Sequence, residues 1–196
     1  MKTLEYLRGI AAKYEGNSFV TGGKRKPDGL WRLSIGEAGC LALARIIEDT
    51  KGLLKMAELR GILEIGTCNG VSTVALSEYG PVVTLDVRQK RYTGEVISGS
   101  PYSDRIVRIV ASDQGAARLV VGRLRPGIAF VDGLHDYDSV WDDFNFVRRL
   151  ARCVIFHDYS AEMFPGAVRA IDEIAKSIGL PLQTCPGTTL AYLVAP

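Results

Sequence analysis

Five short apolar runs, separated by segments of helical periodicity, constrain the fold of this chain most strongly. They begin at residue 61 and read GILEIG, PVVTLDV, DRIVRIVAS, GIAFVDG and CVIFHDY. Apolar runs without polar alternation are typical of parallel strands that helices cover on both faces. Their alternation with helices predicts an α/β fold with a doubly wound, mostly parallel sheet. The final stretch, LPLQTCPGTTLAYLVAP, predicts two closing strands joined at Pro186 and Gly187.

The first 60 residues have a different pattern. Residues 3–15 and a segment that opens at SIGE predict two amphipathic helices, which are separated by the stretch GGKRKPDG. We expect one domain over residues 1–196, with an N-terminal helical cap or substrate region in residues 1–60 and an α/β core in residues 61–196. The GGKRKPDG stretch fits a solvated loop or a lid, and the apolar faces of the two helices could serve a homodimer.

Composition excludes several classes of protein. Lysine and arginine total 24 against 22 for aspartate and glutamate, so there is no bulk positive charge of the kind that draws a protein to nucleic acid or to a membrane surface. No stretch approaches the roughly 20 apolar residues of a membrane span, and the N-terminus lacks the apolar core of a signal peptide. Four well-separated cysteines without a CxxC pair indicate reduced thiols. We therefore expect a cytoplasmic protein.

Every predicted parallel strand ends in polar residues. Ligands in open α/β sheets bind beyond these carboxyl ends. One acid at such a place is equally well explained as a turn residue or a helix cap, but five polar ends at one sheet edge predict a binding site. In chain order the candidates are Glu64 with the loop residues Gly66, Thr67 and Gly70, then Asp86, Ser112 and Asp113, Asp132, and finally His157 and Asp158.

The first loop and the second strand end together suggest a nucleoside site. The loop EIGTCNG lets the backbone approach a ligand at Gly66 and Gly70, but it is not the GxGxxG fingerprint of dinucleotide binding. Asp86 follows Gly66 by about 20 residues, a spacing at which a carboxylate accepts hydrogen bonds from ribose hydroxyls. Adenosine with an unphosphorylated ribose fits this arrangement.

Several motifs in combination resemble a known family. The runs LEIGTCNGVSTVAL, TLDV, VASDQGA, FVDGLHDYDSVWDDF and VIFHDY are similar to class I S-adenosylmethionine-dependent O-methyltransferases. The resemblance covers about residues 61–194. It is strongest to the small group with DGxHxY and FHD motifs, which includes macrolide and sugar O-methyltransferases and cephalosporin hydroxylase relatives, and more distant to catechol O-methyltransferase. It implies a Rossmann-like fold whose seven-stranded sheet has an antiparallel last strand.

The resemblance also implies roles for the candidate residues. S-adenosylmethionine would contact Glu64, Gly66, Thr67 and Gly70 with its methionine and ribose parts, Asp86 with its ribose hydroxyls, Ser112 and Asp113 with its adenine, and Asp132 near its sulfonium. Asp132 and Asp158, with His157 as a further candidate, would hold an optional magnesium ion. Tyr159 replaces the asparagine that is the third metal ligand in catechol O-methyltransferase. His135 stands where that enzyme has its lysine base.

The reaction that follows is a base-assisted transfer of a methyl group to a small-molecule hydroxyl, with His135 and Asp132 as catalytic residues. Two alternatives remain open. One is a hydroxylase-like protein with iron held by His135, Asp132 and His157 or Asp158, and the other is a binding protein that retains the adenosine pocket without catalysis. Trp31, Tyr14 and Phe164 fit an aromatic acceptor pocket or the packing of the N-terminal helices, and Cys68 fits a packing residue.

Overall fold

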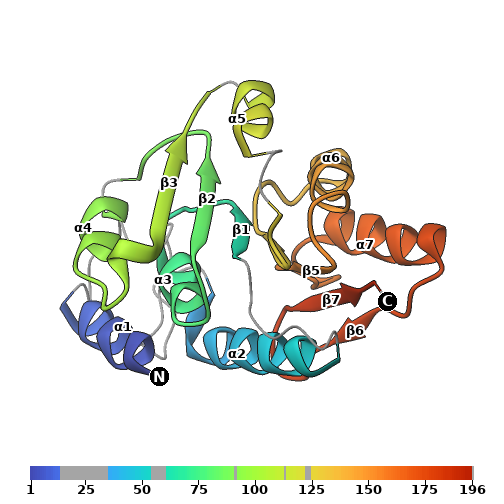
Figure 1. The fold of residues 1–196 in the computed structure, drawn as a ribbon. Coiled ribbons are helices and arrows are strands. Elements are labelled where there is room, and N and C mark those ends of the chain that lie inside the picture. The colour runs from blue at the N-terminus through green and yellow to red at the C-terminus, as the bar shows by residue number, and fades with distance from the viewer. Residues whose placement is uncertain (14–34, 54–60, 91, 113, 122–124, 196) are drawn as a thin grey trace.

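A seven-stranded sheet organises the part of the chain that the computed structural model describes, which is residues 1–13, 35–53, 61–90, 92–112, 114–121 and 125–195 (Figure 1). The strand order is β3-β2-β1-β4-β5-β7-β6. In chain order the strands are β1 Ile62–Ile65, β2 Val82–Asp86, β3 Ile106–Val110, β4 Ile128–Val131, β5 Cys153–Phe156, β6 Gln183–Thr184 and β7 Ala191–Val194.

The pairing of the strands confirms the predicted fold class. β1 to β5 are parallel, with Ile62 of β1 opposite both Val82 of β2 and Ile128 of β4. β7 runs antiparallel to its neighbours β5 and β6. All four residues of β1, β4 and β5 are buried, as a sheet covered on both faces requires. The chain therefore has the Rossmann-like class I methyltransferase fold.

Helices cover both faces of the sheet (Figure 1). Ile62, Ile128 and Ile155 pack with the helices of one face, whereas their neighbours Leu63, Ala129 and Val154 pack with those of the other, because successive strand residues point to opposite sides. The first face carries α1 Lys2–Lys13, α2 Gly36–Leu53, α3 Val71–Ser77 and α4 Thr93–Ser98, and the second carries α5 Gln114–Val121, α6 Tyr137–Val147 and α7 Pro165–Ile178.

The two N-terminal helices are part of this core. Leu7 of α1 and Leu43 of α2 are almost fully buried in the same cluster as the strand residues of the first face. Glu78, after α3, accepts hydrogen bonds from the backbone N–H groups of Lys2 and Thr3 and thereby caps α1. The apolar stripes that suggested a homodimer thus pack inward. A homodimer stays a prediction and would need another surface.

Some elements differ from the sequence-based expectation. α4, α5 and the short 3₁₀ helix Ser103–Arg105 were not predicted individually, since three to eight residues give too few turns for a clear period. α6 ends at Val147 and not near Leu150, because the N–H of Leu150 bonds to the carbonyl of Val147 in a tighter turn. The predicted GGKRKPDG lid, Tyr14 and Trp31 lie outside the described residues.

Two further expectations concern the chain as a whole. Within the ranges described, no helix has both the length and the apolar character needed to span a bilayer. All four cysteines are described, and each is a free thiol.

Candidate active site

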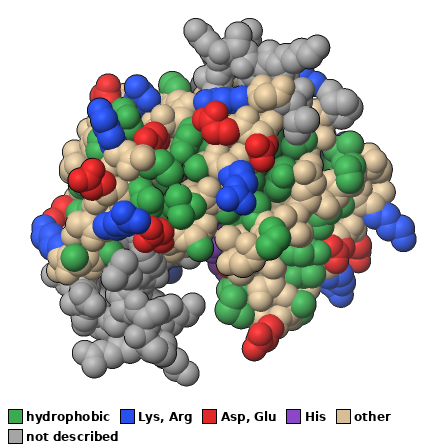
Figure 2. Space-filling model, turned by 90° about the horizontal axis from the view of Figure 1, so that it is seen from below, with side chains coloured by type: hydrophobic (Ala, Val, Ile, Leu, Met, Phe, Trp, Pro, Cys, Tyr) green, Lys and Arg blue, Asp and Glu red, His purple; other side chains and the backbone are tan. Residues whose placement is uncertain are grey.

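A cavity of about 890 Å³ opens at the carboxyl ends of β1, β2, β4 and β5. Its size lies in the range of small-molecule sites. A histidine side chain, coloured purple, is partly visible on the face seen from below in Figure 2. Among the predicted site residues, the lining includes Gly66, Asp86, Asp132, His135, His157 and Asp158.

The β1–α3 loop brings its backbone close to the end of β4. Gly66 has φ +97°, and a Cβ atom built there would lie 1.9 Å from the carbonyl oxygen of Asp132. Glycine is therefore required for the two strand ends to meet. Gly70 also has a positive φ and precedes α3, and its N–H bonds to the carbonyl of Thr67 at 2.7 Å. Cys68, which lies between these two glycines, has φ 45°, an uncommon value for a residue with a side chain.

Glu64 and Thr67 support this loop from beneath and do not belong to the cavity lining. Both are buried, with Thr73 donating to Glu64 Oε2 at 2.5 Å and the Thr67 and Thr84 hydroxyls 2.6 Å apart. Burial raises the pKa of Glu64 to about 7 against the opposing effect of nearby hydroxyls. In the structure these two residues are thus placed to hold the loop and not to line the cavity.

Asp86 is fixed at the opposite side of the loop. Its Oδ2 accepts a 2.8 Å hydrogen bond from the N–H of Cys68, and its Oδ1 accepts one of 3.1 Å from the N–H of Arg88. Each carboxylate oxygen can accept a second hydrogen bond, so two further acceptor positions remain for a diol. Of the predicted adenine contacts, Ser112 is exposed and does not line the cavity, and Asp113 lies outside the described residues.

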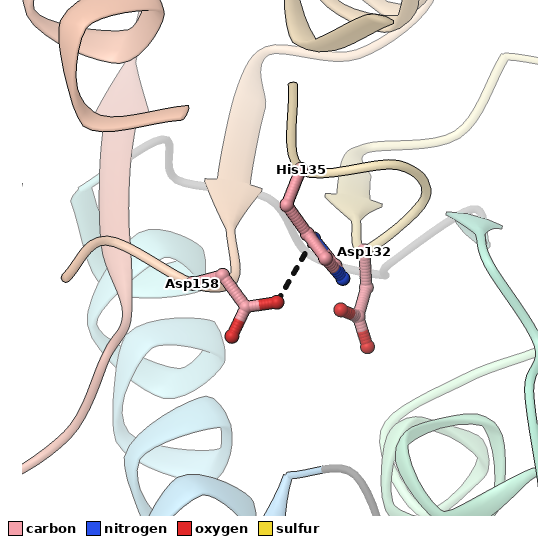
Figure 3. A group of neighbouring side chains, drawn as sticks. All are labelled: Asp132, His135 and Asp158. Carbon is pink, nitrogen blue, oxygen red and sulfur yellow. Dashed lines mark ion pairs between the residues drawn. The ribbon is translucent and has the colours of Figure 1, made fainter. Parts of the chain in front are cut away.

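The ends of β4 and β5 bring two aspartates and two histidines together. Figure 3 shows three of them, Asp132, His135 and Asp158. His135 Nδ1 lies 2.9 Å from Asp158 Oδ2, and His157 Nδ1 lies 2.9 Å from Asp132 Oδ1 and 3.1 Å from Asp158 Oδ1. The side chains of Asp132, His157 and Asp158 are at most 10% exposed, whereas that of His135 is 36% exposed. His135 is therefore the member of this cluster that is open to an incoming molecule.

The backbone at Asp158 is held in an uncommon conformation. Its φ of 60° lies in the left-handed region, which a residue with a side chain adopts at an energetic cost. The N–H of the following Tyr159 bonds to the carbonyl of Thr189, which secures the chain just beyond the turn. This turn directs the Asp158 carboxylate toward the end of β4 instead of along its own strand.

The cluster shifts the pKa of each of its members. Burial lowers the pKa of His157, but Asp132 and Asp158 outweigh it and raise that pKa to about 10. Burial raises the pKa of Asp132. Burial would also raise the pKa of Asp158, yet hydrogen bonds from both histidines bring it below its usual value. The hydrogen bond to Asp158 raises the pKa of His135.

The same residues fit a divalent cation. Asp132, His135 and Asp158 each offer one ligand atom, and these atoms lie within 4.8 Å of one another. Two carboxylates and an imidazole suit manganese, iron or zinc better than magnesium, which prefers oxygen ligands. His157, predicted as a further ligand, instead bridges the two carboxylates through Nδ1.

Phe164, which the sequence suggested for an aromatic acceptor pocket or for packing, lines the cavity. It precedes α7 and lies against His135, with ring centroids 4.7 Å apart. Two other cavity residues, Arg118 of α5 and Asp143 of α6, form an ion pair and were not singled out in the sequence. Asp143 is buried, whereas Asp136 is the N-cap of α6 and accepts from Ser139 N–H at 3.0 Å. One signal was present, since Asp143 lies three residues after Val140 on the apolar stripe.

The central part of the chain matches the model of a known protein family. Residues 63–159 match a family model described as a methyltransferase domain, which confirms the predicted enzyme class at the level of a methyltransferase. The matched range begins in β1 and ends just after Asp158, so it contains all the cavity residues named above except Phe164. A comparison with curated protein sequences gives no match.

Solved structures with the same fold span nearly the whole chain. The O-methyltransferase from Bacillus cereus in complex with SAH has 17% identity and a TM-score of 0.62, covering 99% of this chain and 91% of that one. The O-methyltransferase NovP has 16% identity and a TM-score of 0.63, with 98% and 96% covered. The O-methyltransferase TomG from Streptomyces achromogenes, involved in tomaymycin synthesis and solved with SAM, has 14% identity and a TM-score of 0.60, with 100% and 91% covered.

Proposed function

Residues 63–159 carry a methyltransferase domain, and on this premise we propose that the chain transfers the methyl group of S-adenosylmethionine to a hydroxyl of a small molecule. One observation carries the proposal: a single cavity joins Asp86, prepared by two backbone N–H groups, to the open side chain of His135. The first can hold a ribose, and the second can take a proton. The structural neighbours named above are O-methyltransferases, two of them solved with this cofactor or its product, which supports the same assignment.

The cofactor would lie along the loop from Gly66 to Gly70. In this position its ribose hydroxyls donate to the two oxygens of Asp86, and its sulfonium approaches Asp132, whose buried carboxylate favours the positive sulfur. Gly66 lines the cavity, and its missing side chain lets this loop meet the end of β4.

His135 is the proposed base. Its Nδ1 faces Asp158 Oδ2, so the Nδ1–H tautomer donates there and leaves the lone pair of Nε2 for the acceptor hydroxyl. The acceptor oxygen gives its proton to Nε2 and forms a bond to the methyl carbon, while the bond from that carbon to sulfur breaks and S-adenosylhomocysteine leaves. Phe164 offers a flat apolar surface beside His135, on which an apolar part of the acceptor can pack.

A divalent cation is compatible with this site. Asp132, Asp158 and His135 would hold it, and it would stabilise the negative charge that develops on the acceptor oxygen. His135 cannot bind a cation through Nδ1 while that atom donates to Asp158, so cation binding and this hydrogen bond exclude each other at Nδ1. The match to a methyltransferase family favours methyl transfer over an iron-dependent hydroxylation.

Titration calorimetry with S-adenosylmethionine and S-adenosylhomocysteine tests the proposal. The wild type is expected to bind both with micromolar dissociation constants, and Asp86→Ala is expected to weaken both by about 10-fold or more, because charged hydrogen bonds to the ribose are lost. Asp104→Ala is the control, since this exposed acid lies outside the cavity lining. Absence of binding to the wild type would refute the proposed function.

A further inference from the structure

Asp143 is a buried carboxylate at the cavity wall that the proposed reaction does not use. It lies on α6, is 6% exposed and lines the cavity together with Gly133, Leu134 and Arg118. Its Oδ1 accepts a hydrogen bond from Arg118, a residue of α5 whose guanidinium also lies over the ring of Phe146. Its Oδ2 accepts no hydrogen bond from the described residues.

The position of Asp143 within the cavity follows from the β4–α6 loop. Asp132 and His135, at the two ends of this loop segment, meet Asp158 and form the proposed chemical site. Gly133, between them, lies against Asp143: a Cβ atom built on Gly133 would lie 2.8 Å from Asp143 Oδ2. The Oδ2 atom therefore lies directly behind the loop, in the space that the missing side chain of Gly133 leaves.

Two exposed apolar side chains line the same cavity. Val87 directly follows the proposed ribose acid Asp86 and is 54% exposed, and Leu134 directly follows Gly133 and is 69% exposed. Exposed apolar side chains of this kind favour an apolar ligand surface that covers them. A nucleobase attached to a ribose at Asp86 is the flat apolar group that would reach them.

The chemistry of Asp143 selects one kind of base edge. Burial of the Asp143 side chain disfavours its charged form and raises its pKa to about 6. A hydrogen-bond donor on the ligand would relieve this. The 6-amino group is the only donor that the adenine ring presents once it is attached to ribose.

We infer that Asp143, held by Arg118, accepts a hydrogen bond from the 6-amino group of the cofactor's adenine and so selects adenine at this site. The inference rests on the proposed function, since it requires an adenosine cofactor. At a pH well above 6, where Asp143 is ionised, a 6-oxo base would place its oxygen against the carboxylate, and two acceptors would face each other without a proton between them.

The test compares S-adenosylhomocysteine with S-inosylhomocysteine, its 6-oxo analogue, by calorimetry. The wild type is expected to bind the adenosyl compound about 10-fold or more tightly, as is usual when a site built for a donor meets an analogue without it. Asp143→Asn is expected to bring the ratio of the two dissociation constants toward one, because its amide can donate to the 6-oxo group. Asp138→Asn, an exposed acid of the same helix outside the cavity lining, should keep the wild-type ratio.

Other outcomes separate the inference from simpler explanations. If Asp143 only ties α5 to α6, Asp143→Asn will weaken both compounds equally and leave their ratio unchanged, which overturns the inference. Equal binding of both compounds by the wild type also overturns it and leaves the proposed function intact, and this result does not depend on whether the variant folds. Failure of the wild type to bind either compound refutes both.

Discussion

Glu64 illustrates how a polar side chain next to a ligand loop can act within the fold. It lies under the glycine loop, is fully buried and has one carboxylate oxygen, Oε1, without a hydrogen-bond partner among the described residues. Such a group favours its neutral form, which is consistent with its pKa of about 7. The sequence placed Glu64 correctly at the end of β1, but nothing in the pattern could tell that neighbouring hydroxyl groups enclose it.

Glu64→Gln is expected to change the pH dependence of stability. The folded pKa of about 7 lies above the unfolded value of 4.5, so the stability that this group contributes is complete below about pH 4.5 and is lost as pH rises through 7. Glutamine does not ionise, so the variant keeps its stability as the pH rises. Between pH 5 and pH 8 the free energy of unfolding of the wild type should fall by roughly 2–3 kcal/mol relative to that of the variant. Urea unfolding at a series of pH values measures this. Parallel curves for the two proteins would contradict the expectation.

The proposed role of His135 depends on one ring nitrogen, Nε2. His135→Ala is expected to lower turnover by about 100-fold or more, while the affinity for S-adenosylhomocysteine stays within about 3-fold of the wild-type value. The assay uses methyl-labelled S-adenosylmethionine and an acceptor found by screening hydroxyl compounds. Because Asp158 raises the pKa of His135, the wild-type rate should still be rising with pH above 6.5.

Two further results bear on His135. Turnover that survives the substitution would show that another group takes the proton. Repeating the wild-type assay after treatment with a chelator separates the base from a cation, because a base acting alone retains its rate.

The loops after β1 and β4 contact each other through their backbones at Gly66 and Asp132. Strands and their polar ends were predictable, because continuous apolar runs followed by an acid mark a buried parallel strand and its exit. The contact between Gly66 and the carbonyl of Asp132 was not, because sequence periodicity does not report how closely two loops 66 residues apart approach. The left-handed turn at Asp158 is unpredictable for the same reason, as tertiary contacts hold it.

Gly66→Ala tests this loop contact. The added methyl group would lie 1.9 Å from the Asp132 carbonyl oxygen in a backbone conformation that alanine disfavours, so we expect a loss of about 2 kcal/mol or more in the free energy of unfolding, and weaker cofactor binding. Gly9→Ala in α1 is the matched control, since nothing lies within 4 Å of a Cβ there. The control should be as stable as the wild type or slightly more stable. Equal stability of both variants would contradict the assigned role of Gly66.

Across the whole chain, the sequence predicted the sheet and its topology, but it did not predict the wall of the cavity that Arg118 and Asp143 form. The strand order and the antiparallel β7 agree with the resemblance to class I methyltransferases. Arg118 and Asp143 were missed because α5 is too short to give a clear periodicity and because an acid within a run of acids does not stand out. The predicted lid falls in residues that the structure does not describe.

The place of β7 in the sheet has a consequence for biosynthesis. β5 carries His157 and Asp158 at its end, and its second edge is covered only by β7, Ala191–Val194. A ribosome that adds about 5–20 residues per second needs roughly 2–8 s to proceed from the end of β5 to the end of β7. During that interval the nascent chain exposes the second edge of a fully apolar strand, which a chaperone can shield from pairing with another chain.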